Sequence, residues 1–297
     1  MNEFVALMPD FQITIPDGER IFMMLTKIKF MFCCIVLLIV GSTASAETTF
    51  EKIKRTGKVT VGTEAAFPPF EFIQDGKIVG YGKDILNYVI ANMDVELNQL
   101  DLPWQGILPG VLAGKFDFVA TSVTMNEKRA KTYAFTAPIA TSTTSLGIRD
   151  GDTSMSSVED ICGKVVGTQL ASAGESAARE FDEKMGGDCY AELKLYTAYP
   201  EIYMALANGE IDAVVQSDTS LGVLMKEQPG VYKILGPIGT PGYFCWVTRP
   251  EDTDLRDYLS SQIYAMRDSG ELAKSQDKWF GVRMEIPDDG YLPEGSL

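Results

Sequence analysis

Short apolar runs alternate with amphipathic stretches along the chain from about residue 58 onward. The apolar runs predict strands and the amphipathic stretches predict helices, because the two elements have different hydrophobic periods. Strands are predicted at 58–63, 96–101, 116–120, 164–168, 193–196, 212–216 and 243–248. Helices are predicted at 83–93, 199–207, 219–227, 254–268 and 270–279. This alternation predicts an α/β protein.

Two sequence patterns occur twice in the same order. Residues 57–63 (GKVTVGT) resemble 163–168 (GKVVGT), and residues 111–119 resemble 207–215. Each member of the second pair predicts a helix that ends at a glycine, followed by a strand that begins at an aspartate. The aspartate is Asp117 in the first half and Asp212 in the second. One such match would be explained by a common helix-to-strand joint. Two matches in order favour two lobes of similar topology.

The strand order along the chain predicts how the lobes are divided. We expect residues 47–143 to form the first part of lobe 1 and residues 144–238 to form lobe 2. Too few residues remain for a third lobe, so 239–281 is expected to return to lobe 1. The lobes are then joined at 139–145 and 236–242, and the second joint (GPIGTPG) consists of turn formers with a plausible hinge role. Residues 282–297 are acidic and rich in proline and glycine, and predict a loosely packed C-terminal extension.

Residues 24–46 have the pattern of a secretory signal peptide. A basic start is followed by an uncharged apolar run, 30–40, and by Ala44-Ser45-Ala46. A membrane anchor is the alternative, but a helix of this run would reach only about 16 Å, roughly half the hydrocarbon core. We expect cleavage after Ala46 and a periplasmic location. Residues 1–23 carry acidic side chains that do not suit a signal peptide, and we interpret them as a non-native extension from an over-extended gene start.

Composition excludes several classes of function. The formal net charge is −15, and a polyanion lacks the clustered cations that nucleic-acid binding needs. The chain has no histidine, which removes Ser-His-Asp catalysis and His-ligated metal sites. We therefore expect no metal, no cofactor and no nucleic-acid partner.

Three cysteines follow residue 46, and export permits a disulfide. Sequence alone cannot choose rigorously among three pairings. Cys162 and Cys189 lie in polar, turn-like settings, whereas Cys245 lies in an aromatic, strand-like run that suits a buried thiol. We favour the pair Cys162–Cys189.

The run after the predicted strand 116–120 is the most informative for chemistry. Thr121, Ser122 and Thr124 precede a helix start capped by Asn126, and such a place attracts anions. Arg129 lies one turn further and can hold a carboxylate with two parallel hydrogen bonds. The alternative for Arg129 is a surface arginine paired with Glu127 or solvent.

Other strand ends supply weaker candidates, because ligands of open α/β sheets bind beyond the carboxyl ends of the strands. Phe67 could form an apolar wall of a cleft, and Trp104 is as compatible with packing as with ligand contact. Asp218, next to Ser217, could bind an ammonium group or cap the following helix. The loop 170–174, which contains Ala171 and Ser172, could offer backbone donors to the same carboxylate.

Taken together, these motifs resemble the bacterial extracytoplasmic solute-binding proteins, family 3, that serve polar amino acid ABC transporters. The likeness covers about 50–281. Its motifs are 62–64 with 69–71, 80–81 with Asp84, 114–117, Thr124 with 127–129, 135–138, 209–213 and 278–281. The resemblance implies a periplasmic binding protein-like fold of two α/β lobes joined by two hinge strands, with a ligand cleft between them.

The resemblance also implies roles for particular residues. The carboxylate-binding arginine falls on Arg129, its hydroxyl partner on Thr124 and a backbone donor on Ser122. The second-lobe donors fall on Ala171 and Ser172, and Phe67 corresponds to an aromatic that stacks on the ligand. We include Glu64 and Thr121 among the ligand-binding candidates, and bridged cysteines recur in the family at the places of Cys162 and Cys189.

One position departs from the family pattern. The ammonium-binding aspartate of the family falls on Ser217, with Asp218 one step on. Either the register slips by one residue and Asp218 serves, or the ligand lacks an ordinary α-amino group. A lesser departure is Gly82, where the family prefers aspartate.

We expect a monomeric, non-enzymatic substrate-binding component of an ABC importer. It would capture an amino acid or related small carboxylate by closure of the lobes and deliver it to permease subunits in the inner membrane. The alternative is an enzyme similar to the cyclohexadienyl (arogenate) dehydratases, with Glu175 as the catalytic acid. The plainer interpretation of Glu175 is that it complements the helix dipole in a first turn. A third option, the sensor part of a receptor, has no transmembrane or signalling segment after Gly281 to support it.

Overall fold

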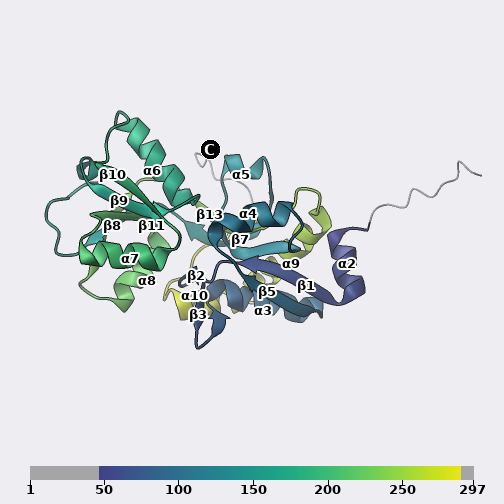
Figure 1. Cartoon of the computed structure of the whole chain (residues 1–297). Helices are drawn as coiled ribbons and strands as arrows, with labels where there is room; N and C mark the ends of the chain where they lie inside the picture. Colours follow the sequence, from purple (N-terminus) through teal and green to yellow (C-terminus); the bar gives the residue numbers. More distant parts are fainter. Residues whose placement is uncertain (1–46, 289–297) are drawn as a thin grey trace, which may run out of the picture. The chain divides into compact units, whose positions relative to one another are not determined.

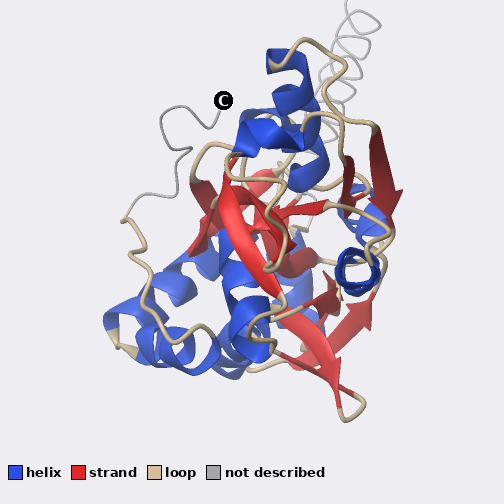
Figure 2. Cartoon of the chain, turned by 90° about the vertical axis from the view of Figure 1, so that its left-hand side faces the viewer, coloured by secondary structure: helices blue, strands red, loops and turns tan. Residues whose placement is uncertain are grey.

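A computed structural model describes residues 47–288 of the 297-residue chain. The predicted signal peptide and N-terminal extension lie outside the described residues, as does the end of the tail from 289. Each of two lobes in the described part contains a five-stranded sheet flanked by helices (Figure 1). Figure 2 shows the strands with helices packed around them. The expected two-lobed α/β fold is confirmed.

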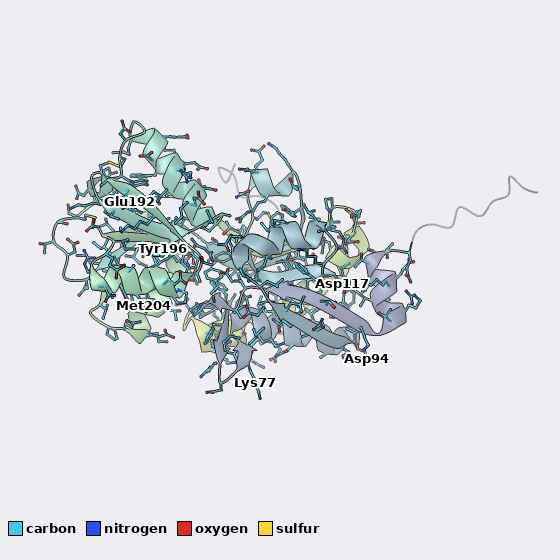
Figure 3. All side chains as sticks on the ribbon, viewed as in Figure 1. Lys77, Asp94, Asp117, Glu192, Tyr196 and Met204 are labelled. Atoms are coloured by element: carbon cyan, nitrogen blue, oxygen red, sulfur yellow. A yellow bond between two sulfur atoms is a disulfide. The ribbon has the colours of Figure 1, made fainter. Side chains whose placement is uncertain are left out.

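The first lobe has the sheet order β5-β1-β6-β13-β7. Strand β1 is parallel to β5 and β6, whereas β13 is antiparallel to β6 and β7. The strands are β1 (Lys58–Thr63), β5 (Glu96–Asp101), β6 (Phe118–Thr124), β7 (Ala134–Ser142) and β13 (Gly242–Thr248). A small sheet adds β2 (Ala66–Phe67), β3 (Glu71–Gln74) and β4 (Lys77–Val79), with Lys77 at the hairpin (Figure 3). The helices are α2 (Thr49–Thr56), α3 (Tyr81–Met93), α4 (Trp104–Leu112), α5 (Glu127–Ala130), α9 (Thr253–Asp268) and α10 (Glu271–Trp279).

The second lobe has the equivalent order β10-β9-β11-β8-β12. Strands β10 and β11 are parallel to β9, and β8 is antiparallel to β11 and β12. The strands are β8 (Thr144–Arg149), β9 (Val165–Gln169), β10 (Glu192–Tyr196), β11 (Ala213–Ser217) and β12 (Tyr232–Pro237). The helices are η1 (Val158–Ile161), α6 (Ala173–Lys184), α7 (Tyr199–Asn208) and α8 (Asp218–Glu227). In both sheets, three parallel strands are followed by two further strands, each of which is antiparallel to the strand before it in the sheet.

The repeated aspartates of the two halves have the same structural role. Asp117 accepts a hydrogen bond from the backbone N–H of Thr60 at 2.8 Å, and Asp212 accepts one from that of Val165 at 2.9 Å. Each aspartate also donates its own N–H to the carbonyl of the same residue. This reciprocal pair of hydrogen bonds joins β1 to the start of β6 in the first lobe and β9 to the start of β11 in the second. The shared role explains why the motif occurs twice.

The chain passes between the sheets at two neighbouring places within residues 47–288. Thr143 separates β7 from β8, and residues 238–241 separate β12 from β13. The two segments are joined, because the N–H groups of Ile238 and Gly239 donate to the carbonyl of Thr144 at 2.9 and 3.0 Å. Because β13 pairs with β6 and β7, the C-terminal part of the chain lies in the first lobe.

Two sequence-based expectations differ from the structure. The strand predicted at 116–120 runs over Phe118–Thr124, because Asp117 is held by its hydrogen bonds to Thr60 and because β13 pairs with Val123 and Thr124. The hydroxyl residues 121, 122 and 124 therefore lie within the strand rather than after it. The tail was expected to be loosely packed, but Ile286 is buried in the core of the first lobe and Asp288 lies 2.8 Å from Arg267.

The disulfide Cys162–Cys189 is formed, and Cys245 is a buried free thiol, as expected from their settings. Between residues 47 and 288, no helix has the length and apolar character required to cross a membrane.

Candidate functional site

A cavity lies between the two lobes. The carboxyl ends of β1, β6, β9 and β11 meet around it, as the strand-end rule anticipates. Its lining residues are Glu64, Phe67, Trp104, Ser122, Thr124, Arg129, Ser142, Thr144, Gln169, Ser172, Ala173, Gly174, Tyr199, Gln216, Ser217 and Phe244.

Arg129 brings an unpaired positive charge to this cavity. Asn126 caps the short helix α5 by accepting the N–H of Arg129 at 2.9 Å, which fixes the arginine one turn after β6. The guanidinium donates to the carbonyl of Thr124 at 2.9 Å and, across the lobes, to that of Ala171 at 3.3 Å. Among the described residues, no carboxylate oxygen lies within 4.0 Å of it, so the surface pair with Glu127 is not formed. Burial lowers the pKa of Arg129 to about 10, which still leaves it charged at neutral pH.

The N-terminus of α6 lies on the opposite wall of the cavity. Ser172 is its N-cap and accepts the N–H of Glu175 at 3.2 Å, while Ala173 and Gly174 line the cavity. The first N–H groups of a helix have no acceptor within it and favour anions. A Cβ on Gly174 would lie 2.5 Å from Thr168 Oγ1, so glycine permits this close approach to β9. Arg129 and this helix start together provide a site for a carboxylate.

The loop before α6 has an unusual backbone. Ala171 has a φ of 62°, a left-handed conformation that costs energy for a residue with a Cβ. In this conformation its carbonyl accepts from Arg129 and its N–H donates to Glu175 Oε2 at 2.7 Å. Ala171 thus contacts the arginine but does not line the cavity.

Aromatic rings form the apolar walls. Phe67, on β2, stacks on Tyr199 of the second lobe with ring centroids 5.6 Å apart. Trp104 is buried at the start of α4, and the guanidinium of Arg129 lies 5.2 Å from its ring. Trp104 therefore both packs in the core and lines the cavity, so the two interpretations of this residue are compatible.

Glu64 is the carboxylate that lines the cavity. It follows β1 and is buried, and Gln169 of the second lobe donates a short hydrogen bond to it. Burial, with a smaller effect of Asp101, raises the pKa of Glu64 to about 7. A cationic group placed beside Glu64 would restore its charged form.

The hydroxyl candidates separate into two groups. Ser122 and Thr124 line the cavity, but Thr121 turns its hydroxyl to Glu71, 3.0 Å away. Ser217 lines the cavity and caps α8 by accepting the N–H of Ser220 at 3.3 Å. Asp218 does not line it: its N–H donates to the carbonyl of Thr143, and its carboxylate accepts from Thr219. The second-lobe wall is therefore neutral at the place where the resemblance implies an aspartate.

Six of the lining residues were not among the sequence-based candidates: Ser142, Thr144, Gln169, Tyr199, Gln216 and Phe244. Ala173 and Gly174 belong to the candidate loop 170–174 but were not singled out within it. Gln169 is the last residue of β9, and Gln216 is the next-to-last residue of β11. Strict application of the rule that ligands bind at strand ends would therefore have found both. Ser142 and Thr144 flank a crossing segment, and Tyr199 opens a helix. Phe244 carries no local signal, because the distant pairing of β13 with β6 brings it to the site.

The candidate acid for a dehydratase has another role in this structure. Glu175 lies in the first turn of α6 and forms an ion pair with Arg179 at 2.8 Å, in addition to its bond to Ala171. Glu175 does not line the cavity. In the described part of the chain, no group of three acidic, cysteine or histidine side chains is arranged to hold a metal ion.

Known proteins that resemble this chain in sequence and in structure include several that bind amino acids. The L-cystine-binding protein TcyJ of Escherichia coli (strain K12) is 26% identical over 252 residues, an alignment that covers 83% of this chain and 92% of that protein. A solved ancestral arginine-binding protein bound to arginine is 29% identical, with a TM-score of 0.70 over 76% of this chain and 99% of that one. The ancestral amino acid-binding protein AncCDT-1, a precursor of cyclohexadienyl dehydratase, is 25% identical, with a TM-score of 0.72 over 78% of this chain and all of that one (100%).

The match extends to a family profile. Residues 59–282 match that of the bacterial extracellular solute-binding proteins, family 3. This range takes in both sheets and the cavity between them. The chain therefore belongs to the bacterial extracellular solute-binding proteins, family 3.

Proposed function

We propose that this protein captures an amino acid, or a related small carboxylate, between its lobes and delivers it to the permease of an ABC importer. The observation that carries the proposal is the unpaired guanidinium of Arg129, which faces the N-terminus of α6 across the cavity. The names of the similar proteins, which bind L-cystine, arginine or amino acids, support this ligand class. We further propose that the chain acts in the periplasm as a monomer after removal of residues 24–46.

The charges of the cavity limit the ligand. Arg129 provides one positive group for a carboxylate, and Glu64 provides one acidic group for a cation or a hydrogen-bond donor. The wall at Gln216 and Ser217 offers only neutral groups. The best-matched ligand has one carboxylate, an apolar stem that packs against the aromatic wall formed by Phe67, Trp104 and Tyr199, and a donor group at the far end.

The test is a thermal-shift panel of the proteinogenic amino acids, L-cystine and their 2-hydroxy and 2-keto analogues. A ligand present at a hundred times its Kd stabilises the folded state by about 2.7 kcal/mol, which is readily seen as a rise in Tm. Arg129→Ala should weaken the best binder at least hundredfold, since an unpaired buried carboxylate costs about 3–5 kcal/mol. Arg129→Lys should restore part of the loss, because lysine keeps the charge but not the paired geometry.

Lys128→Ala is the matched control, because Lys128 is an exposed cation on the same helix. The Lys128→Ala variant should bind the best ligand of the panel with the affinity of the wild type, as measured by calorimetry. Unchanged affinity in Arg129→Ala would refute the assignment of Arg129, and the absence of any binder in the panel would refute the ligand class. If incubation with prephenate or arogenate yields no product, the dehydratase alternative is removed.

A further inference from the structure

Glu71 is a fully buried carboxyl group directly behind the wall of the cavity. It opens β3 and has an exposed fraction of 0%. Its Oε2 accepts from Thr121 Oγ1 at 3.0 Å and from the N–H of Ser122 at 3.3 Å, and its Oε1 lies 3.3 Å from Ser122 Oγ. Ser122 in turn lines the cavity. Glu71 therefore contacts the ligand site through one residue without lining it.

Within residues 47–288, no lysine or arginine is placed to neutralise Glu71. The nearby acid is Glu64, which raises the pKa of Glu71 further. On the neighbouring helix α3, Lys83 donates to Gln99, and Asp84 is held by Lys278 and Trp279. The phenol of Tyr81 donates to the carbonyl of Ile139. Burial, only partly offset by the donors of Thr121 and Ser122, raises the pKa of Glu71 to about 8.

Gly82 creates the space that Glu71 occupies. A Cβ at this position would lie 1.8 Å from Glu71 Oε1, so any side chain there would displace the carboxyl group.

We propose that Glu71 is a positioning residue that sets the hydrogen-bonding sense of the Ser122 hydroxyl toward the ligand carboxylate. When Glu71 is protonated, its Oε1–H donates to Ser122 Oγ, and the hydroxyl proton of Ser122 is free to point into the cavity as a donor. When Glu71 is ionised, Ser122 must donate to it and presents only lone pairs to the ligand. The inference rests on the proposed function, because it requires a carboxylate at Arg129.

The consequence is a proton-linked affinity. The protonated form binds the carboxylate better, so binding raises the pKa of Glu71 and takes up a proton near pH 8. Affinity should fall as pH rises through this range, by roughly tenfold between pH 7 and pH 9 if the ionised form does not bind. Glu64 also titrates in this region, so the contribution of Glu71 has to be isolated by difference.

The first measurement needs no ligand. Infrared difference spectra between pH 6 and pH 9.5, recorded in a Glu64→Gln background, should show a protonated carboxyl band that is lost at high pH when Glu71 is present, and the same band should be missing when Glu71→Gln is added. The glutamine amide reproduces the donor and acceptor arrangement of the neutral acid. If the difference spectra with and without Glu71→Gln are identical in this background, Glu71 carries no titrating proton and the proposal is overturned, whether or not the proposed function holds.

The second measurement is calorimetry from pH 6 to pH 9.5, with the panel member that gives the largest thermal shift as the probe. Glu71→Gln should keep the low-pH affinity of the wild type and lose the decline above pH 8, both alone and in a Glu64→Gln background. Ser122→Ala should bind more weakly and also lose the decline. A Glu71→Gln profile parallel to the wild type, or an affinity that rises with pH in the Glu64→Gln background, would overturn the proposal while leaving the proposed function intact.

Discussion

The carboxyl group of Glu64 couples the stability of the protein to pH. Its pKa is raised to about 7 in the folded protein and returns to about 4.3 on unfolding. The folded state therefore holds the proton more tightly, and stability that is full below pH 4 is lost as pH rises through 7. Glu64→Gln removes this loss. We expect the ligand-free variant to be more stable than the wild type at pH 8 by about 3 kcal/mol, with little difference at pH 4.5.

Urea unfolding of ligand-free protein at the two pH values measures this difference. Glu192→Gln is the control, since Glu192 is an exposed residue on β10 in the second lobe (Figure 3). This control should follow the wild type at both pH values. If Glu64→Gln also follows the wild type, Glu64 is not desolvated in the ligand-free protein.

Ser217 offers a gain-of-function test at the residue scale. Serine and aspartate both accept hydrogen bonds at a helix N-cap, so Ser217→Asp should keep the cap of α8. It would also add a carboxylate to the neutral wall of the cavity. We expect the variant to bind α-amino acids at least tenfold more tightly than the wild type, while their 2-hydroxy analogues gain nothing. Isothermal titration of each pair checks this, and equal gains for both classes would show that position 217 does not contact an ammonium group.

Sequence predicted those site residues whose chemistry is local. Arg129 follows from a capped helix turn after a strand, and Ser172 follows from its place in a loop before a predicted helix. Tyr199 and Phe244 could not be found in this way, because their positions depend on contacts between the lobes and on the distant pairing of β13. Asp218 was a candidate because it lies at a strand end, but its N–H bonds to the carbonyl of Thr143 and its side chain does not line the cavity.

At the scale of elements, the strands and helices with a clear hydrophobic period were predicted, whereas β7, β8 and β12 were not among the predicted strands. Strand lengths were not predictable either, since pairing with a partner decides where a strand ends. β6 illustrates this: its last residues pair with β13, which is more than a hundred residues away in sequence. The packing of Ile286 was also missed, because an acidic composition rich in proline and glycine does not reveal a single buried side chain.

The disulfide ties two elements of the second lobe. Cys162 follows η1 and Cys189 precedes β10, with a sequence separation of 27. Closing a loop of this size stabilises the folded state by about 2–4 kcal/mol, mainly by restricting the unfolded chain. The double variant Cys162→Ser/Cys189→Ser should lose this amount in urea unfolding. Ligand affinity should be unchanged, because neither cysteine lines the cavity.

Chemical reduction supplies the control for this prediction. Dithiothreitol should lower the Tm of the wild type to that of the double variant and leave the double variant unaffected. An equal drop in both proteins would assign the effect to something other than the disulfide.

At the scale of the whole described molecule, the lobes are held together by a small set of polar contacts. Gln169 bonds to Glu64, Arg129 to the carbonyl of Ala171, and Gln105 to the carbonyls of Leu170 and Thr197 at 3.5 and 3.3 Å. The first two involve groups that would touch a ligand. Gln105 does not line the cavity, so it reports on closure alone.

Gln105→Ala should therefore weaken binding without altering the ligand contacts. Loss of one or two exposed hydrogen bonds costs the closed state about 0.5–1.5 kcal/mol, which corresponds to a two- to tenfold weaker affinity. The change should appear as faster ligand release, because these contacts form only after the lobes meet. Stopped-flow fluorescence measures the release rate, with Gln74→Ala in the exposed β3–β4 hairpin as the matched control. If Gln105→Ala releases the ligand at the wild-type rate, contacts outside the cavity do not hold the lobes closed, and retention rests on the ligand bridging Arg129 and α6.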